Sequence, residues 1–147
     1  MDWIRVETME QLKEAFAVRM EVFVKEQGVP ADVELDEYDD SPDACRHYIV
    51  RSGGDTIAAG RYRTYEPGVA KMQRIAVRKR HRGKGVGAFL LKAMEEEAGR
   101  EGYRASILDA QCSAEAFYLK QGYATVSKEP FLDAGIPHVR MSKRLDL

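Results

Sequence analysis

The chain has 147 residues, of which 44% are hydrophobic and 32% are charged, and a formal net charge of −1 at pH 7. This length and composition predict one soluble globular domain, residues 1–147, with a substantial core. The near-zero net charge gives no overall attraction to nucleic acid or to an anionic membrane, so neither is expected as a partner. No apolar stretch approaches the roughly 20 residues of a membrane span, and we see no signal-peptide pattern, so we expect a cytoplasmic protein.

The two cysteines, Cys45 and Cys112, are far apart in the sequence and match no metal-ligand spacing. We therefore expect free thiols and no metal site. Catalysis by Cys112 as a nucleophile is a weaker alternative.

The first predicted elements are a strand, a helix and an acidic loop. Residues 3–6 are typical of a short strand. Thr8 and Gln11 form a capping-box signal, and apolar residues then recur at helical spacing over residues 9–23. Glycine and proline end this helix and open a loop, residues 32–43, that carries seven carboxylates.

The rest of the chain predicts an antiparallel meander followed by alternating helices and strands. This order indicates a mixed α/β fold in which helices cover one central sheet. Strands are predicted at residues 47–51, 56–65, 69–77, 105–110, 123–126 and 138–143, and helices from 86 to about 100 and from 113 to about 121.

The most informative motif is the basic, glycine-rich stretch at residues 78–87, Arg-Lys-Arg-His-Arg-Gly-Lys-Gly-Val-Gly. It lies between the predicted strand that ends at Val77 and an amphipathic helix, so it forms a strand-to-helix turn. Free backbone N–H groups, the positive end of a helix and nearby cations together favour a phosphate group. The sequence therefore predicts a binding site for a phosphate compound at this basic turn.

Several phosphate-binding motifs fit the basic turn poorly. The Walker pattern needs Gly-Lys-Ser/Thr, and Gly83-Lys84-Gly85 lacks the hydroxyl residue. The dinucleotide fingerprint needs a βαβ unit, whereas a meander precedes this turn. A nucleic-acid binder is a further alternative, which the net charge and the lack of interleaved aromatic residues weaken.

The pattern that fits is Arg82-x-x-Gly85-x-Gly87. Together with residues 72–77 before it and residues 110–123 after it, it resembles the GCN5-related N-acetyltransferase (GNAT) family over nearly the whole chain. Residues 19–27, the pattern Glu34-x-Asp36 and residues 135–141 are similar to the YjcF-type branch of this family. The C-terminal pattern Pro-His-x-x-Met also resembles the glyphosate N-acetyltransferase group.

The resemblance implies a mostly antiparallel, twisted central sheet of about six or seven strands with a splayed fourth and fifth strand, flanked by about four helices. It implies acetyl-CoA as the co-substrate and no metal. Glycines would let the turn's backbone approach the pyrophosphate closely, and a backbone N–H of the fourth strand would stabilise the oxyanion at the thioester. By resemblance, the residues at the acetyl-CoA site are Ile75, Ala76, Val77, Arg82, Gly83, Lys84, Gly85, Val86, Gly87 and Gln111, the last standing where Asn is frequent in the family.

The resemblance also implies two residues that handle protons. Tyr118 matches the family's general acid, although a thiol pKa of about 8.5 makes this acid helpful rather than essential. His138 is the preferred base, because an ordinary histidine pKa of about 6.5 suits proton removal near neutrality. Glu26, His47 and His81 are weaker candidates for the base. The alternatives are a core aromatic for Tyr118 and a strand histidine without a role for His138.

The sequence gives opposing predictions for the acceptor. Arg19 and Arg74 match arginines that hold an anionic substrate in the glyphosate group. The acidic loop, residues 32–43, instead favours a cationic acceptor such as a polyamine or a lysine. Glu26, near the acceptor cleft of the family, is a third predicted substrate-binding residue. Ordinary salt bridges between the arginines and the acidic loop are the alternative.

The function expected from the resemblance is transfer of acetyl from acetyl-CoA to a primary amine of a small molecule. Direct attack in a ternary complex is expected, with proximity supplying much of the acceleration. A homodimer is compatible with the resemblance. The alternative is a non-catalytic acyl-CoA-binding or sensor module with the same fold.

Overall fold

The computed structural model describes residues 1–146, and these residues form two compact units. The first unit comprises Met1–Arg63 and Arg74–Met94, and the second comprises Thr64–Gln73 and the chain from Glu95 onward. None of the helices in residues 1–146 is long and apolar enough to cross a membrane. Three elements contribute to both units: β3 (Asp55–Glu66), β4 (Val69–Val77) and α3 (Val86–Arg100).

In the first unit, β1 (Asp2–Arg5), β2 (Arg46–Ser52) and β3 pair antiparallel in that order. Helix α1 (Met9–Arg19) begins after Thr8, whose side chain accepts a hydrogen bond from the Gln11 backbone N–H. The predicted capping box is therefore confirmed. At Met20 the helix changes to a π-helix, η1 (Met20–Glu26), which ends within three residues of the predicted end.

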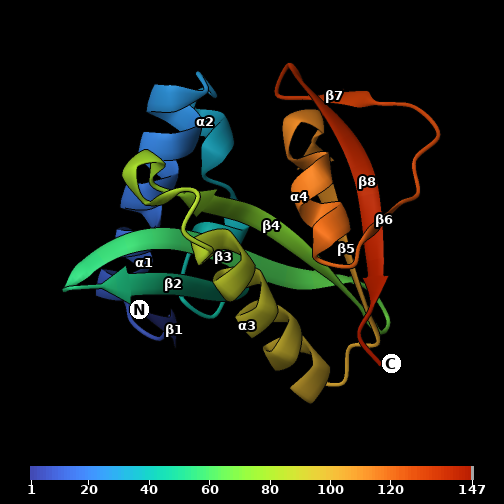
Figure 1. The fold of residues 1–147 in the computed structure, drawn as a ribbon. Coiled ribbons are helices and arrows are strands. Elements are labelled where there is room, and N and C mark those ends of the chain that lie inside the picture. The colour runs from blue at the N-terminus through green and yellow to red at the C-terminus, as the bar shows by residue number, and fades with distance from the viewer. Residues whose placement is uncertain (147) are drawn as a thin grey trace. The chain divides into compact units, whose positions relative to one another are not determined.

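The core of the first unit lies on both faces of its strands. Helix α1 lies over one face of β2 and β3 (Figure 1). Its Leu12 and Val18 belong to the same core cluster as Ile49 and Ala59 of these strands. On the other face, α3 lies so close to Gly60 of β3 that an added Cβ would stand 2.9 Å from the Met94 sulfur. A side chain at residue 60 would force the Met94 side chain to shift, and glycine lets α3 pack close to β3 without that rearrangement.

In the second unit, β4 pairs with β5 (Ala105–Gln111) in parallel, from Val69↔Ala105 to Met72↔Leu108. Strand β8 (Ile136–Arg144) then pairs antiparallel with β5, β6 (Ala124–Thr125) and β7 (Phe131–Asp133). Helix α4 (Glu115–Lys120) follows the short η4 (Cys112–Ala114). The predicted mixed α/β fold with about four α-helices around a mostly antiparallel sheet is confirmed. The parallel pairing of β4 with β5 was not predicted, and residues 1–146 hold eight strands rather than six or seven.

The acidic loop contains two short helices that the sequence analysis did not predict, α2 (Ala31–Glu34) and η2 (Glu37–Asp39). Asp36 caps η2 by accepting a hydrogen bond from the Tyr38 backbone N–H at 3.0 Å. The loop is thus an ordered segment of the first unit.

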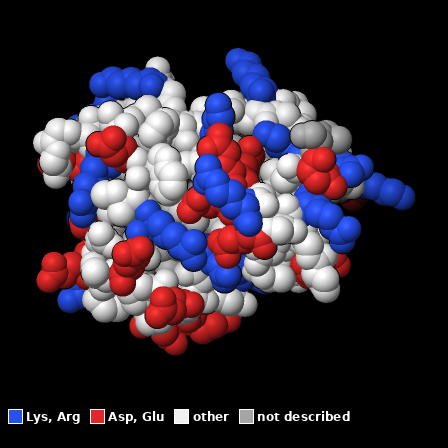
Figure 2. All heavy atoms as spheres, turned by 90° about the horizontal axis from the view of Figure 1, so that it is seen from below, with Lys and Arg blue, Asp and Glu red and all other residues white. Residues whose placement is uncertain are grey.

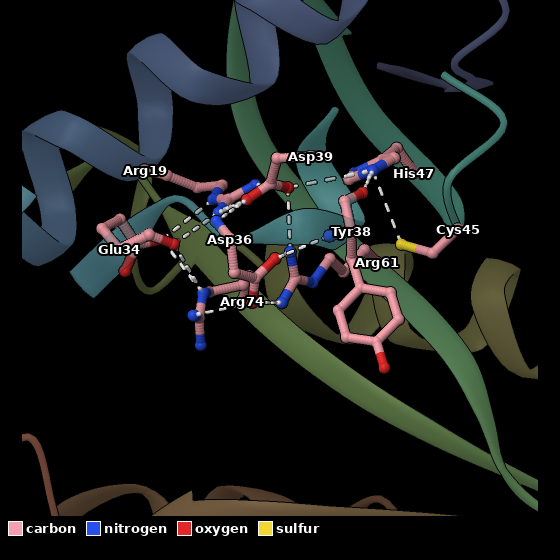
Figure 3. Close-up of polar contacts among 9 residues, drawn as sticks. All are labelled: Arg19, Glu34, Asp36, Tyr38, Asp39, Cys45, His47, Arg61 and Arg74. Atoms are coloured by element: carbon pink, nitrogen blue, oxygen red, sulfur yellow. Dashed lines mark hydrogen bonds and ion pairs between the residues drawn. The ribbon is translucent and has the colours of Figure 1, made fainter. Parts of the chain in front are cut away.

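Three arginines and three carboxylates fix this segment to the first unit in a buried ion cluster (Figure 3). Arg19 of α1 is 1% exposed and donates to Glu34 at 2.9 Å and to Asp39 at 2.7 Å. Arg61 of β3 is also 1% exposed and donates to Asp36 at 2.7 and 2.8 Å and to Asp39 at 2.8 Å. The members of the ion cluster are Arg19, Arg61, Arg74, Glu34, Asp36 and Asp39.

Burial and charge pairing together set the ionisation of the ion cluster. Burial alone would raise the pKa of Asp39, but hydrogen bonds and charge from Arg19 and the charge of Arg61 lower it well below its ordinary value. At Glu34 burial outweighs the nearby arginines and raises the pKa. The formal charges of the cluster sum to zero, so removing one of its almost fully buried members, Arg19, Arg61 or Asp39, leaves an uncompensated buried charge at a cost of about 3–5 kcal/mol.

His47 of β2 borders the ion cluster. It is 1% exposed, and its Nε2 lies 2.7 Å from the Tyr38 carbonyl oxygen, so this nitrogen carries the proton and donates it. The same nitrogen lies 3.5 Å from the Cys45 sulfur. Burial lowers the pKa of His47 and raises the pKa of Cys45 to about 12, so both side chains are neutral at pH 7.

The buried, neutral His47 predicts an acid-sensitive fold. Below its ordinary pKa of about 6.5 an exposed histidine of the unfolded chain takes up a proton that His47 in the folded protein resists. Its contribution to stability is therefore present above about pH 6.5 and is lost as the pH falls, by up to about 1.4 kcal/mol per pH unit. Urea unfolding at pH 7.5, 6 and 5 should show a shallower loss in His47→Gln than in wild type.

Wild type and His47→Gln share all other titratable groups, so the pH dependence that these groups give to stability cancels in the comparison. One of them is Glu34, whose raised pKa makes the folded protein more stable as the pH falls, opposite to the effect of His47. Parallel stability curves for wild type and His47→Gln would contradict the prediction.

Candidate functional site

The basic turn leads from β4 through a short 3-10 segment, η3 (Lys79–His81), into α3. Gly83 and Gly85 are exposed and have φ angles of 76° and 80°, which residues with side chains rarely adopt. A Cβ at either glycine would meet no atom within 4 Å, so backbone conformation rather than crowding requires glycine. The space around the turn is therefore open, and the first N–H groups of α3 have no partner inside the helix.

Arg82 fixes the shape of the turn from within the first unit. Its Nε donates to the Val77 carbonyl oxygen at 2.9 Å, and its two Nη atoms donate to the Glu26 carboxylate at 2.6 and 2.8 Å. The hydrogen bonds from Arg82 lower the pKa of Glu26. Glu26 is thus a weaker base than an ordinary glutamate, and the structure gives it a turn-holding contact that the sequence analysis did not predict.

A hollow of about 390 Å³ lies beside the basic turn, between it and η1. Both of its carboxylates already pair with arginines, Glu21 with Arg78 at 2.9 Å and Glu26 with Arg82. The other lining residues are cations, so the hollow favours an anionic group. Its lining consists of Glu21, Lys25, Glu26, Lys79 and Arg80.

The end of β4 supplies the three residues predicted to lie beside the thioester. Ala76 is 3% exposed and belongs to the core under α1, whereas Ile75 and Val77 are half-buried. Because the Val77 carbonyl holds Arg82, this part of the strand and the basic turn form one connected structure.

Arg19 and Arg74, predicted to hold an acceptor, both belong to the ion cluster. Arg19 is almost fully buried, with four hydrogen bonds to Glu34 and Asp39. Arg74 keeps 26% of its side chain exposed, and burial lowers its pKa. The three arginines of the ion cluster neutralise three of the seven carboxylates of the acidic loop, so the charges of the cluster indicate neither an anionic nor a cationic acceptor.

In the second unit, Gln111 and His138 are register partners in the β5–β8 pair. His138 is 8% exposed and stacks on Phe131, with ring centroids 6.2 Å apart. Its Nδ1 lies 2.6 Å from the Ile136 carbonyl oxygen and therefore donates, which leaves the Nε2 lone pair as the acceptor.

Tyr118 of α4 is half-buried, and its ring packs edge-on against Phe117 at 5.0 Å and Tyr123 at 5.9 Å. Burial raises the pKa of Tyr118 to about 12, so its hydroxyl stays protonated near neutral pH. Tyr123 donates to Glu95 at 2.8 Å and lies 2.7 Å from the Ser106 hydroxyl. These contacts fix the ring against which Tyr118 packs.

Sequence reasoning missed Arg61 and the Tyr123–Glu95 hydrogen bond. An arginine between Gly60 and Tyr62 in an apolar strand was a usable signal, because a buried charge requires a partner. No local pattern indicated Glu95, which lies 28 residues before Tyr123.

Comparisons with known proteins agree with this architecture. The family model "Acetyltransferase (GNAT) domain" matches residues 8–145. The chain is 48% identical over 134 residues to the uncharacterised N-acetyltransferase YjcF of Bacillus subtilis (strain 168), covering 91% of this chain and 93% of that protein.

Solved structures show the same similarity. A Lactobacillus plantarum protein superposes with a TM-score of 0.90 at 32% identity, covering 98% of this chain and 97% of that chain. An acyl-CoA N-acyltransferase from Pseudomonas aeruginosa superposes with a TM-score of 0.82 at 26% identity, covering 97% and 99%. The chain therefore belongs to the GNAT acetyltransferase family and is an acyltransferase.

Proposed function

We propose that the protein transfers an acetyl group from acetyl-CoA to the primary amine of a small molecule, by direct attack in a ternary complex. The basic turn carries this proposal, because its exposed glycine backbone at the start of α3 suits a pyrophosphate. Lys25, Lys79 and Arg80 in the adjoining hollow suit the 3′-phosphate. When bound, acetyl-CoA supplies an activated thioester.

Backbone groups and Tyr118 stabilise the charges that develop during the transfer. A backbone N–H of Ile75, Ala76 or Val77 donates to the thioester oxygen as it becomes negative. Tyr118 donates to the departing thiolate. With its pKa near 12, against about 8.5 for a thiol, full proton transfer is uphill, so the hydroxyl acts mainly as a hydrogen-bond donor.

His138 removes a proton from the attacking amine. The bond from its Nδ1 to the Ile136 carbonyl fixes the tautomer, so Nε2 offers the lone pair that a base needs. The alternative base, Glu26, is held by Arg82 with a lowered pKa.

The charges on the face drawn in Figure 2 give no support to a nucleic-acid partner. On the face in Figure 2, Lys and Arg side chains (blue) lie among Asp and Glu side chains (red), with no broad area of one sign among the described residues drawn there. A nucleic-acid binder needs a basic stripe on one face.

Thiol release from acetyl-CoA tests the proposal directly. We expect turnover with at least one member of a panel of polyamines, amino acids, aminoglycosides and amino-phosphonates. Tight CoA binding without turnover on any amine would instead support a non-catalytic acyl-CoA-binding module.

We predict that Gly85→Glu abolishes the thermal protection given by CoA. The new carboxylate would repel the pyrophosphate, and a residue with a side chain rarely adopts the φ of 80° that the turn needs at this position. The control is Gly99→Glu, which adds the same charge at an exposed position near the other end of α3 and should keep the protection. Undiminished protection in Gly85→Glu would refute the assignment of the turn.

We predict that Tyr118→Phe lowers kcat by about tenfold or more while leaving the affinity for acetyl-CoA nearly unchanged. Steady-state kinetics check this. Tyr103→Phe removes another tyrosine hydroxyl of the second unit, one bonded to Thr64, and should leave kcat unchanged. Equal kcat values for Tyr118→Phe and wild type would remove Tyr118 from the mechanism.

A further inference from the structure

Arg74 lies inside β4 with a φ angle of 57°, in the left-handed region that suits glycine. Among residues 1–146, Ala134 is the other non-glycine residue with positive φ, and it lies in the turn between β7 and β8. A left-handed residue within a strand is typical of a β-bulge, which redirects the chain and is frequent next to active sites. An arginine in this conformation is strained, so its surroundings must hold it there.

Contacts with carboxylates of the ion cluster hold the Arg74 side chain in place (Figure 3). Its Nε lies 3.3 Å from the Glu34 carbonyl oxygen and 3.2 Å from the Glu34 carboxylate, and its Nη2 lies 3.5 Å from Asp36. Glu34 is itself 3% exposed and bonded by Arg19 at 2.9 Å. Asp36 is bonded twice by Arg61. The side chain of Arg74 is therefore tied to carboxylates that do not move freely.

Packing of the next two side chains, Ile75 and Ala76, fixes the course of the backbone after Arg74. Ile75 packs over Gly60 of β3, where an added Cβ would lie 3.4 Å from the Ile75 side chain. Ala76 packs into the core under α1. The two side chains lie on opposite faces, so the peptide groups between Arg74 and Val77 are fixed once the backbone has turned at Arg74.

We propose that Arg74 is a positioning residue whose attachment to Glu34 and Asp36 holds the left-handed turn in β4. This turn sets the direction of the backbone N–H groups of residues 75–77. The inference rests on the proposed function, in which one of these groups donates to the thioester oxygen. In this role Arg74 acts through the backbone of β4.

Two substitutions of Arg74 separate its backbone role from its charge. Arg74→Gly and Arg74→Ala both remove the guanidinium, but only glycine adopts a φ of 57° without strain. We expect Arg74→Gly to keep kcat within about threefold of wild type and Arg74→Ala to lose about tenfold or more, both with unchanged KM for amine and acetyl-CoA. An equal rise of the amine KM in both variants, or equal kcat values, would overturn the proposal.

Unfolding experiments give a second measure that does not depend on activity. At ordinary strand positions alanine is more stabilising than glycine. Because residue 74 has a positive φ, we expect the reverse order here, with a higher Tm for Arg74→Gly than for Arg74→Ala. A higher Tm for Arg74→Ala would overturn the proposal. The control is Arg51→Ala, which removes the pair with Glu14 outside the ion cluster and should leave kcat unchanged.

The failure of this proposal is distinguishable from that of the proposed function. Absence of wild-type turnover with every amine refutes the proposed function, whereas the order of the two Tm values decides whether residue 74 is held in a strained conformation.

Discussion

The pairing of three arginines with three largely buried carboxylates constrains how the acidic loop packs in the first unit. A lone buried charge would be costly, so the segment that carries Glu34, Asp36 and Asp39 has to fold back onto α1, β3 and β4. The two short helices of that segment are consequences of this requirement. Through Arg74, the same pairing ties the course of β4 to a residue 40 positions earlier in the chain.

In the basic turn, a side chain shapes the loop and the backbone is exposed to solvent. The Arg82 side chain is committed to Glu26 and to the Val77 carbonyl, so it shapes the turn. The exposed glycine backbone and the start of α3 are left for a ligand. In the proposed function, a chain with a net charge of −1 can therefore suit a highly charged donor, because the proposed binding groups are local dipoles and a few cations rather than an overall positive field.

Local signals made much of the fold predictable, whereas the long-range contacts were not. The capping box at Thr8 and the bounds of β4 depend on neighbouring residues and were predicted correctly. The change to a π-helix at Met20 was missed because the apolar spacing fits either helix. Strand β7 was missed because Leu132 is 72% exposed and the strand exists only through its pairing with β8. The role of Arg19 stayed ambiguous because its carboxylate partners lie 15 and 20 residues away.

A crystal structure of the protein bound to CoA would test most directly whether the basic turn binds the pyrophosphate. We predict pyrophosphate oxygens within hydrogen-bond distance of the backbone N–H groups of Gly83, Gly85 or Val86, with the Arg82–Glu26 ion pair intact. CoA bound at another place, with the backbone of residues 82–87 free of phosphate, would contradict this prediction.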